Sequence, residues 1–266
     1  LPAALALGWR GRNEPGVRFA LCWLIPAFLV FEATPTKLVH YTLPTYGALA
    51  WLMAVAATRG EVGPVARWFG VGLSALVGTV LAAAVFYLFS EYGDPSDLPA
   101  TLLTALLLAA AGLVGAYLLW RGEPTKALVA AAALSILGHG AFAAAFIPRL
   151  EPLLVSKRTA DILTEQRLLP RQGITPAPVA VAGYAEPSLV FELGTPTDLG
   201  GVDQAVDALA DQRPAVVEGR EQAQFEAALK ARDVKAREIG KVEGLNYSNG
   251  DDTTLRVYAP IPSEGQ

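Results

Sequence analysis

The sequence predicts a multi-span α-helical membrane domain followed by a small α/β domain on the outer, periplasmic side of the membrane. The chain has 266 residues and is 53% hydrophobic, above the roughly 45–50% that is usual for soluble domains. Residues 1–148 hold 8 Lys+Arg and 7 Asp+Glu, whereas residues 149–266 hold 13 and 18. All five tryptophans lie in the first part. We therefore expect a transmembrane domain at 1–148 and a periplasmic domain at 149–266.

Composition also excludes several classes of protein. The net charge of −4 comes almost entirely from the second part, so nothing in the chain favours nucleic-acid binding. With Cys22 as its single cysteine, the chain can form neither an internal disulfide nor a cysteine metal site. It begins at Leu1, without a methionine or a signal-peptide pattern. We interpret it as the product of a longer gene, truncated at its N-terminus.

Long apolar segments recur along the first part of the chain. Each approaches the roughly 20 residues that cross the hydrocarbon core of a bilayer. Charges are almost absent from them, so they leave no polar face for water and are unlike the buried helices of a soluble protein. Leu1–Gly8 reads as the remainder of one further span. We expect five complete spans, near Val17–Phe31, Tyr41–Thr58, Val65–Phe89, Pro99–Trp120 and Thr125–Ile147.

The loops between these spans predict the orientation of the chain. The first, third and fifth loops contain seven basic residues, whereas the second and fourth contain Lys37 alone. Because loops rich in Lys and Arg stay in the cytoplasm, the odd loops are expected there. Trp9, Trp68 and Trp120 then lie at the cytoplasmic interface, where indole rings are favoured. The chain leaves its last span on the outer side, as a multi-pass protein of the bacterial inner membrane.

Two features within the spans invite an interpretation. In the third span, small residues recur every fourth position and predict close packing against a neighbouring helix: Gly70, Ser74, Gly78 and Ala82. In the last span, His139 is an ionisable group within the membrane and is therefore a functional candidate. A neutral imidazole bonded to a carbonyl of a neighbouring helix is the more favoured explanation of His139.

The second part of the chain has the pattern of a small α/β domain with a mostly parallel sheet. Glu151–Leu169 reads as an amphipathic helix, and Asn249-Gly250 is a strong turn signal between the last two strands. The domain has no histidine, no cysteine and no Gly-rich phosphate loop. We expect the other elements at Pro178–Gly183 (strand), Pro187–Leu193 (helix), Val202–Ala210 (helix), Ala215–Glu218 (strand), Glu221–Arg232 (helix), Val234–Val242 (strand) and Thr253–Tyr258 (strand).

The second loop concentrates chemically active side chains at the outer face. Lys37, His40 and Tyr41 lie together there, and Lys37 is the only basic residue expected on the outer side of the membrane domain. A lysine supplies a point charge for a lipid-linked phosphate, while imidazole and phenol supply directional donors. The alternative is that Lys37 extends to the interface and the two rings anchor the start of a helix. The residues by themselves leave both interpretations open.

The same loop carries a resemblance to a known family. The string E-A-T-P-T-K-L-V-H-Y-T-L-P-T-Y-G-A-L (Glu32–Leu49) resembles a loop and helix start in bacterial glycosyltransferase family 39, whose members include protein O-mannosyltransferases and aminoarabinose transferases. Val39 and Gly47 depart from the family pattern, which has proline at both positions. Gly183–Thr195 (G-Y-A-E-P-S-L-V-F-E-L-G-T) and Asn246–Gly250 (N-Y-S-N-G) are similar to the outer domain of one branch.

This resemblance implies that a sugar is transferred from a polyprenyl-phosphate carrier to a lipid, glycan or protein acceptor at the outer face of the inner membrane. It implies a carrier-phosphate site at Lys37, His40 and Tyr41, and a catalytic aspartate in a first outer loop that precedes this chain. The chain alone is then expected to be inactive. Tyr184 and Glu186 follow a strand end, where α/β sheets place ligands, and are possible acceptor contacts. No metal-ligand cluster is apparent, and whether a divalent metal takes part is left open.

Two other functions fit the sequence less completely. A transporter or lipid flippase would place charges and broken helices at the membrane midplane, where only His139 stands. A non-catalytic membrane anchor that presents the acidic outer domain to a partner would be expected to expose an apolar patch on that domain. Neither accounts for the cluster of Lys37, His40 and Tyr41.

Overall fold

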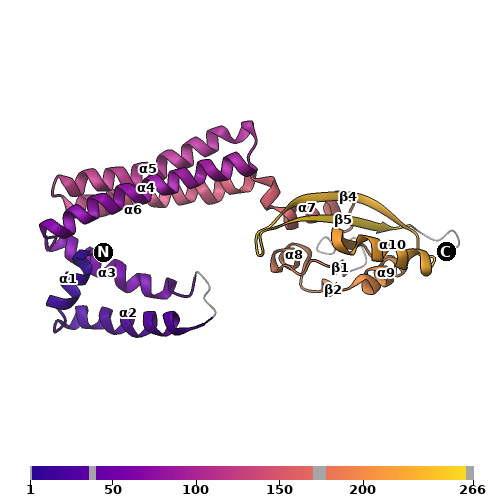
Figure 1. Cartoon of the computed structure of the whole chain (residues 1–266), viewed down its shortest axis with the longest axis horizontal. Helices are drawn as coiled ribbons and strands as arrows, with labels where there is room; N and C mark the ends of the chain where they lie inside the picture. Colours follow the sequence, from indigo (N-terminus) through magenta and orange to yellow (C-terminus); the bar gives the residue numbers. More distant parts are fainter. Residues whose placement is uncertain (1, 36–39, 170–177, 262–266) are drawn as a thin grey trace. The chain divides into compact units, whose positions relative to one another are not determined.

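The computed structural model of the protein describes residues 2–35, 40–169 and 178–261. The chain divides into two compact units, Leu1–Ile147 and Pro148–Gln266 (Figure 1). The first is helical, and the second is built around a five-stranded sheet. The predicted fold class, a multi-span helical domain followed by a small α/β domain, is therefore confirmed.

Unit 1 is a set of antiparallel apolar helices, and four of them are long and apolar enough to cross a membrane. The second predicted span differs from its expectation. Residues 41 and 42 form a turn, and the helix that follows has 16 residues, or about 24 Å at 1.5 Å per residue. Full length is thus confirmed for four of the five spans. The helices are α1 (Pro2–Arg10), α2 (Pro15–Ala33), α3 (Leu43–Thr58), α4 (Pro64–Tyr92), α5 (Leu98–Trp120) and α6 (Pro124–Ala141).

Proline marks where these helices begin. Helices α2 to α6 each have a proline in one of their first two positions. The first turn of a helix needs no backbone N–H partner, and the fixed φ of proline suits it. At its other end, α6 continues through a π-helical turn, Phe142–Phe146, into a short 3-10 turn, Ile147–Arg149. The membrane segment therefore ends close to the boundary between the two units.

Helices α4 and α5 pack through backbone contact. A Cβ placed on Gly112 would lie 2.5 Å from the carbonyl oxygen of Ser74 and 2.6 Å from the Cα of Gly78. The Ser74 hydroxyl donates a hydrogen bond of 3.0 Å to the Gly112 carbonyl. Apolar side chains gain little by leaving lipid, so close backbone approach and interhelical hydrogen bonds stabilise such pairs. The packing predicted for the small residues of the third span is confirmed, and its partner is Gly112.

The loop charges lie at opposite ends of this helix pair. Helix α5 separates Asp97 from Arg121 with 23 helical residues, which corresponds to about 35 Å. The acidic turn Pro95–Asp97 joins α4 to α5, and the basic loop at Arg121 joins α5 to α6. The alternation of acidic and basic loops along the sequence thus corresponds to two ends of the helical unit.

Unit 2 is a mixed sheet with helices on both faces. The strand order is β2-β1-β3-β5-β4. β1 pairs in parallel with β2 and β3, whereas β5 pairs antiparallel with β3 and β4. The expectation of a mostly parallel sheet is therefore wrong: the strong turn at Asn249-Gly250 closes a long hairpin, which makes half of the pairings antiparallel. The strands are β1 (Ala180–Ala182), β2 (Asp198–Gly200), β3 (Ala215–Glu218), β4 (Ala236–Asn246) and β5 (Asp251–Pro260).

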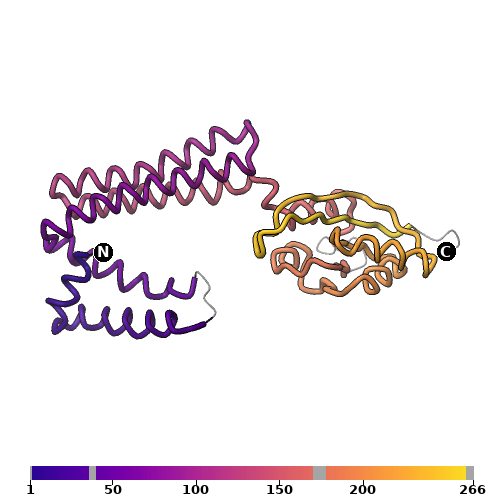
Figure 2. The backbone as a smooth tube through the Cα atoms, viewed as in Figure 1, coloured from indigo at the N-terminus to yellow at the C-terminus, as the bar shows by residue number. Residues whose placement is uncertain are grey.

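The helices of unit 2 agree closely with the sequence pattern. Two of them have the expected bounds, and the amphipathic segment after the last span is helical only from Val155 to Glu165. Strand β2 was not expected, because its Asp-Leu-Gly sequence has no run of β-forming residues. The helices are α7 (Val155–Glu165), α8 (Pro187–Leu193), α9 (Val202–Ala210) and α10 (Gln222–Ala231). Figure 2 traces the hairpin of β4 and β5 at the yellow end of the chain.

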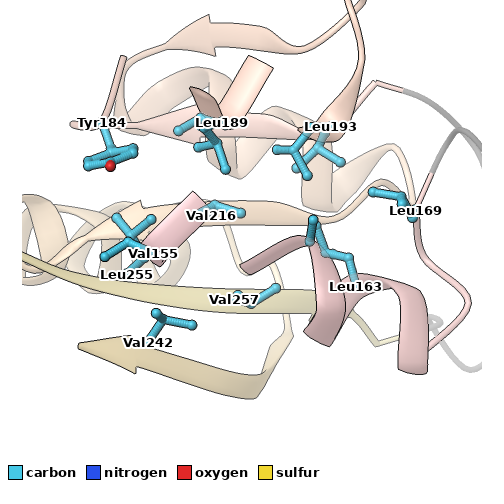
Figure 3. Close-up of a cluster of buried hydrophobic side chains, with 13 residues drawn as sticks. Val155, Leu163, Leu169, Tyr184, Leu189, Leu193, Val216, Val242, Leu255 and Val257 are labelled. Atoms are coloured by element: carbon cyan, nitrogen blue, oxygen red, sulfur yellow. The ribbon is translucent and has the colours of Figure 1, made fainter. Parts of the chain in front are cut away.

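Alternate strand residues supply the two cores of this sandwich. Val181, Val216 and Val257 are paired neighbours across the sheet and lie in the core beneath α7 and α8 (Figure 3). Ala182 and Val217, the next residues along, lie in the core beneath α9 and α10. Successive side chains of a strand point to opposite faces, so one short sheet stabilises helix layers on both sides.

Candidate functional site

The loop between α2 and α3 is only partly described. Helix α2 ends at Ala33, where the Thr34 amide donates to the Phe31 carbonyl, and α3 begins at Leu43. Lys37 lies outside the described residues, so the prediction about its role stays a prediction. His40 and Tyr41 are described, and they form the turn that leads into α3.

The rings of this loop contact one another. His40 and Tyr41 meet edge to face, with ring centroids 5.4 Å apart and planes at 87°. Tyr41 also packs on Phe31 at 5.8 Å. His40 is exposed and Tyr41 is half-buried. Aromatic pairs at such distances contribute about 0.5–1.5 kcal/mol beyond their buried area, so Tyr41 ties the start of α3 to the end of α2 and holds His40 beside it.

His139 bonds within its own helix. Its Nδ1 lies 2.8 Å from the carbonyl oxygen of Ser135, one turn earlier, and the side chain is exposed. The expected bond to a carbonyl of a neighbouring helix is therefore wrong. A residue four positions earlier on the same helix is within reach of a ring nitrogen, so no second helix is needed. His139 is not brought near the α2–α3 loop residues in any printed contact.

Tyr184 and Glu186 follow β1 directly, as expected, but they have different surroundings. The Tyr184 side chain is only 4% exposed and belongs to the core beneath α7 and α8 (Figure 3). Burial raises the pKa of its phenol above the usual value because the charged phenolate is poorly solvated there, while Ser156 opposes that rise. Tyr184 is thus a neutral phenol at physiological pH.

Glu186 is the centre of a hydrogen-bond cluster that the sequence did not reveal. Its Oε1 accepts from the Asn246 amide at 3.1 Å and from the Ser248 hydroxyl at 2.5 Å. Ser248 also donates its backbone N–H to the Asn246 side chain at 3.1 Å. The two outer-domain strings that resemble the family, around Gly183–Thr195 and Asn246–Gly250, therefore meet at one carboxylate. A resemblance in two separate strings was the only signal of this contact.

Beside this cluster lies a cavity of about 200 Å³. Its walls come from the start of α7, from α8 and from the tip of the β4–β5 hairpin. Among the described residues, no group of three or more His, Cys, Asp or Glu side chains could hold a metal ion. The cavity is lined by Leu153, Leu154, Val155, Ser156, Lys157, Tyr184, Ser188, Phe191, Glu192 and Tyr247.

Comparison with known proteins gives relatives of one kind. No family model matches the chain. A stretch of 96 residues is 40% identical to the undecaprenyl phosphate-alpha-4-amino-4-deoxy-L-arabinose arabinosyl transferase of Edwardsiella ictaluri, covering 35% of this chain and 17% of that protein. A stretch of 124 residues is 32% identical to the enzyme of the same name from Aeromonas hydrophila, covering 43% and 22%.

The fold is similar to that of one solved protein over nearly the whole chain. The crystal structure of ArnT from Cupriavidus metallidurans in the apo state aligns with a TM-score of 0.58 and 16% identity, over 97% of this chain and 48% of that one. The resemblance to family 39 glycosyltransferases is confirmed. The structure of the same ArnT bound to undecaprenyl phosphate aligns with a TM-score of 0.54 and 19% identity.

These ArnT comparisons cover only part of each relative. The chain spans about half the length of the ArnT structures and less than a quarter of the curated transferases. At 16% and 19% identity, the ArnT structures establish a common fold.

Proposed function

We propose that this chain forms the C-terminal part of a glycosyltransferase of the bacterial inner membrane. The enzyme moves a sugar from a polyprenyl-phosphate carrier to an acceptor at the outer, periplasmic face. The observation that carries this proposal is the agreement of sequence and fold: the matched relatives are named as undecaprenyl-phosphate aminoarabinose transferases, and the similar fold belongs to an ArnT whose structure was also solved with undecaprenyl phosphate bound.

In this proposal the α2–α3 loop holds the phosphate of the carrier. Lys37 offsets the negative charge of the phosphate, and this charge grows on the leaving group as the sugar departs. Tyr41 and His40 donate directional hydrogen bonds to the phosphate oxygens. The packing of Tyr41 on Phe31 supports this role, because a ring already held in place loses little freedom when its hydroxyl engages a ligand.

The acceptor side is assigned to unit 2. We place Tyr184 and Glu186 there as acceptor contacts or as supports of the residues that make them. Glu186 is half-buried and already accepts hydrogen bonds from Asn246 and Ser248, which favours a supporting role. No nucleophile–base pair occurs among the described residues of this unit, so its part is to position an acceptor. The activating carboxylate belongs to a segment that precedes this chain.

The orientation follows from charge. The odd loops contain seven of the eight basic residues of residues 1–148 and are assigned to the cytoplasm. The α2–α3 loop and unit 2 then share the outer side. A carrier phosphate and an acceptor would meet on that side, as transfer requires.

The test is a transfer assay on the complete protein, reconstituted in liposomes with a radiolabelled polyprenyl-phosphate sugar and membrane glycolipid as acceptor. Label is expected to leave the carrier and appear in the glycolipid. A flippase would instead move the intact labelled carrier between leaflets without consuming it, and an anchor would do neither. Either of those results would overturn the proposal.

A further inference from the structure

The cavity in unit 2 brings together residues from three separate segments of chain. Ser156 and Lys157 come from the first turn of α7, Ser188 and Glu192 from α8, and Tyr247 from the hairpin tip. The hydroxyls of Ser156 and Ser188 lie 2.8 Å apart and form a hydrogen bond. Side chains separated by up to 91 positions of sequence thus converge on one space, which is typical of a binding pocket.

The lining combines aromatic faces with hydrogen-bonding groups. Tyr184 is buried in the wall, while Tyr247 is 60% exposed. Hydroxyls of Ser156 and Ser188 can both donate and accept, Lys157 donates, and Glu192 accepts. A sugar ring has this dual character: its C–H face packs on an aromatic ring, and its hydroxyls need partners of both kinds. A purely apolar ligand would leave the polar lining unsatisfied.

The size of the cavity fits one ring. About 200 Å³ corresponds to roughly seven waters at about 30 Å³ each, which is comparable with a monosaccharide. An oligosaccharide would have to extend beyond the walls. The cavity therefore selects a single residue of a larger glycan, or a single sugar headgroup.

The Glu186 cluster controls where Tyr247 lies. Asn246 and Ser248, the two neighbours of Tyr247 in the chain, both donate to the Glu186 carboxylate. The backbone at Tyr247 is thereby fixed on both sides, and its exposed ring stays at the cavity. An exposed aromatic ring held in this way presents contact area at low cost in conformational entropy.

We propose that this cavity is a subsite for one sugar ring of the acceptor, with Tyr247 as the stacking residue and Glu186 as its positioning residue. The assignment rests on the proposed function for its acceptor, and it adds a class of ligand: the acceptor presents a pyranose. A glycan-bearing lipid satisfies this requirement, whereas an unglycosylated protein does not.

The experiment measures binding without transfer. Saturation-transfer NMR is recorded on the complete protein in nanodiscs, with methyl glucoside and glucosamine as probes. Ring protons of a probe are expected to receive saturation. The signal is expected to vanish in Tyr247→Ala and to persist in Tyr247→Phe, which keeps the ring. Leu199→Ala, which removes an exposed side chain of unit 2 outside the cavity lining, is the matched control and should bind as the unaltered protein does.

Kinetics supply a second readout. Tyr247→Ala is expected to raise KM for the glycolipid acceptor by about tenfold, the loss of about 1.4 kcal/mol of binding, with KM for the carrier unchanged. Glu186→Gln is expected to raise the same KM by less, because it acts through Tyr247. Equal probe signals in Tyr247→Ala and the unaltered protein would overturn the subsite.

The two proposals fail in different ways. If transfer occurs but no probe binds, the subsite is refuted and the transferase proposal stands. If the probes bind through Tyr247 but the polyprenyl-phosphate sugar is not consumed, the transfer reaction is refuted and the cavity remains a sugar site.

Discussion

The carboxylate of Glu186 accepts a hydrogen bond from the hydroxyl of Ser248, 62 positions later in the chain. Glu186 opens the turn into α8 after β1, and Ser248 lies in the tip of the β4–β5 hairpin. A hairpin tip that projected into water would be among the least stable parts of a domain. Here a charge-assisted contact fixes it to the carboxyl end of a parallel strand.

Removing this contact should loosen the hairpin tip. Charge-assisted hydrogen bonds contribute about 1.5–3 kcal/mol when buried, and partial exposure of Glu186 reduces this to about 1 kcal/mol. We expect Glu186→Ala to speed hydrogen exchange at the amides of residues 246–250 by about fivefold. Glu165→Gln, at an exposed glutamate that ends α7, is the control. Additive effects of Glu186→Ala and Ser248→Ala would contradict a direct contact.

The α4–α5 contact should be intolerant of any side chain at Gly112. Its Cβ would overlap the Ser74 carbonyl and Gly78, so the helices must separate and the Ser74 hydrogen bond must lengthen. We expect Gly112→Leu to cost roughly 1–3 kcal/mol or more and to lower the amount of folded protein in membranes. Gly72→Leu, where a Cβ meets nothing within 4 Å, is the matched control. Equal abundance of both variants would refute close packing at Gly112.

Lys37 should govern affinity for the carrier. Its replacement by alanine in the complete protein removes a charge-assisted contact of about 1.5–3 kcal/mol, or roughly ten- to a hundredfold in affinity. Tyr41→Phe should cost less because the ring still packs on Phe31, and Lys37→Arg should retain part of the activity. The measurement is transfer rate against carrier concentration at equal membrane abundance.

Lys126→Ala is the matched control for Lys37→Ala. Lys126 lies in the loop assigned to the cytoplasm, where its exposed side chain pairs with Glu123, and such pairs contribute little to stability. Its loss should leave the carrier profile unchanged. If Lys37→Ala behaves like Lys126→Ala, Lys37 is an interfacial anchor and has no part in the active site.

The orientation can be tested with single cysteines. Cys22, the only native cysteine, is first replaced by alanine. An impermeant thiol reagent applied from the periplasm should then label Ser96→Cys and Asp252→Cys but not Arg121→Cys, because the last lies beyond α5. Labelling of Arg121→Cys before permeabilisation would refute the assignment of the odd loops to the cytoplasm.

Much of the fold was predictable because local signals agreed with the tertiary structure. Prolines at helix starts and long uncharged runs determine α2, α4, α5 and α6. In unit 2, α9 and β3 have the expected bounds, since amphipathic spacing and an apolar run are both legible locally. Strand β2 was missed because pairing with β1, and not its own sequence, makes it a strand.

The candidate site was only partly predictable for the same reason. His40 and Tyr41 are adjacent in the chain, so their contact follows from sequence. The contact of Glu186 with Ser248 does not, because neither residue has a local feature that specifies its partner. The cavity beside them likewise exists only where α7, α8 and the hairpin meet.

The sequence by itself determined that this protein has membrane-spanning helices, where they begin and end, which loops share a side, and that an α/β unit follows. These properties depend on hydrophobicity, charge and proline, which act over one or two helical turns. Tertiary structure alone decided that Gly112 is the partner of Gly78, that the sheet is mixed, and that Glu186 holds the tip carrying Tyr247. Such contacts join residues distant in sequence, and their free energy arises only once the intervening chain has folded.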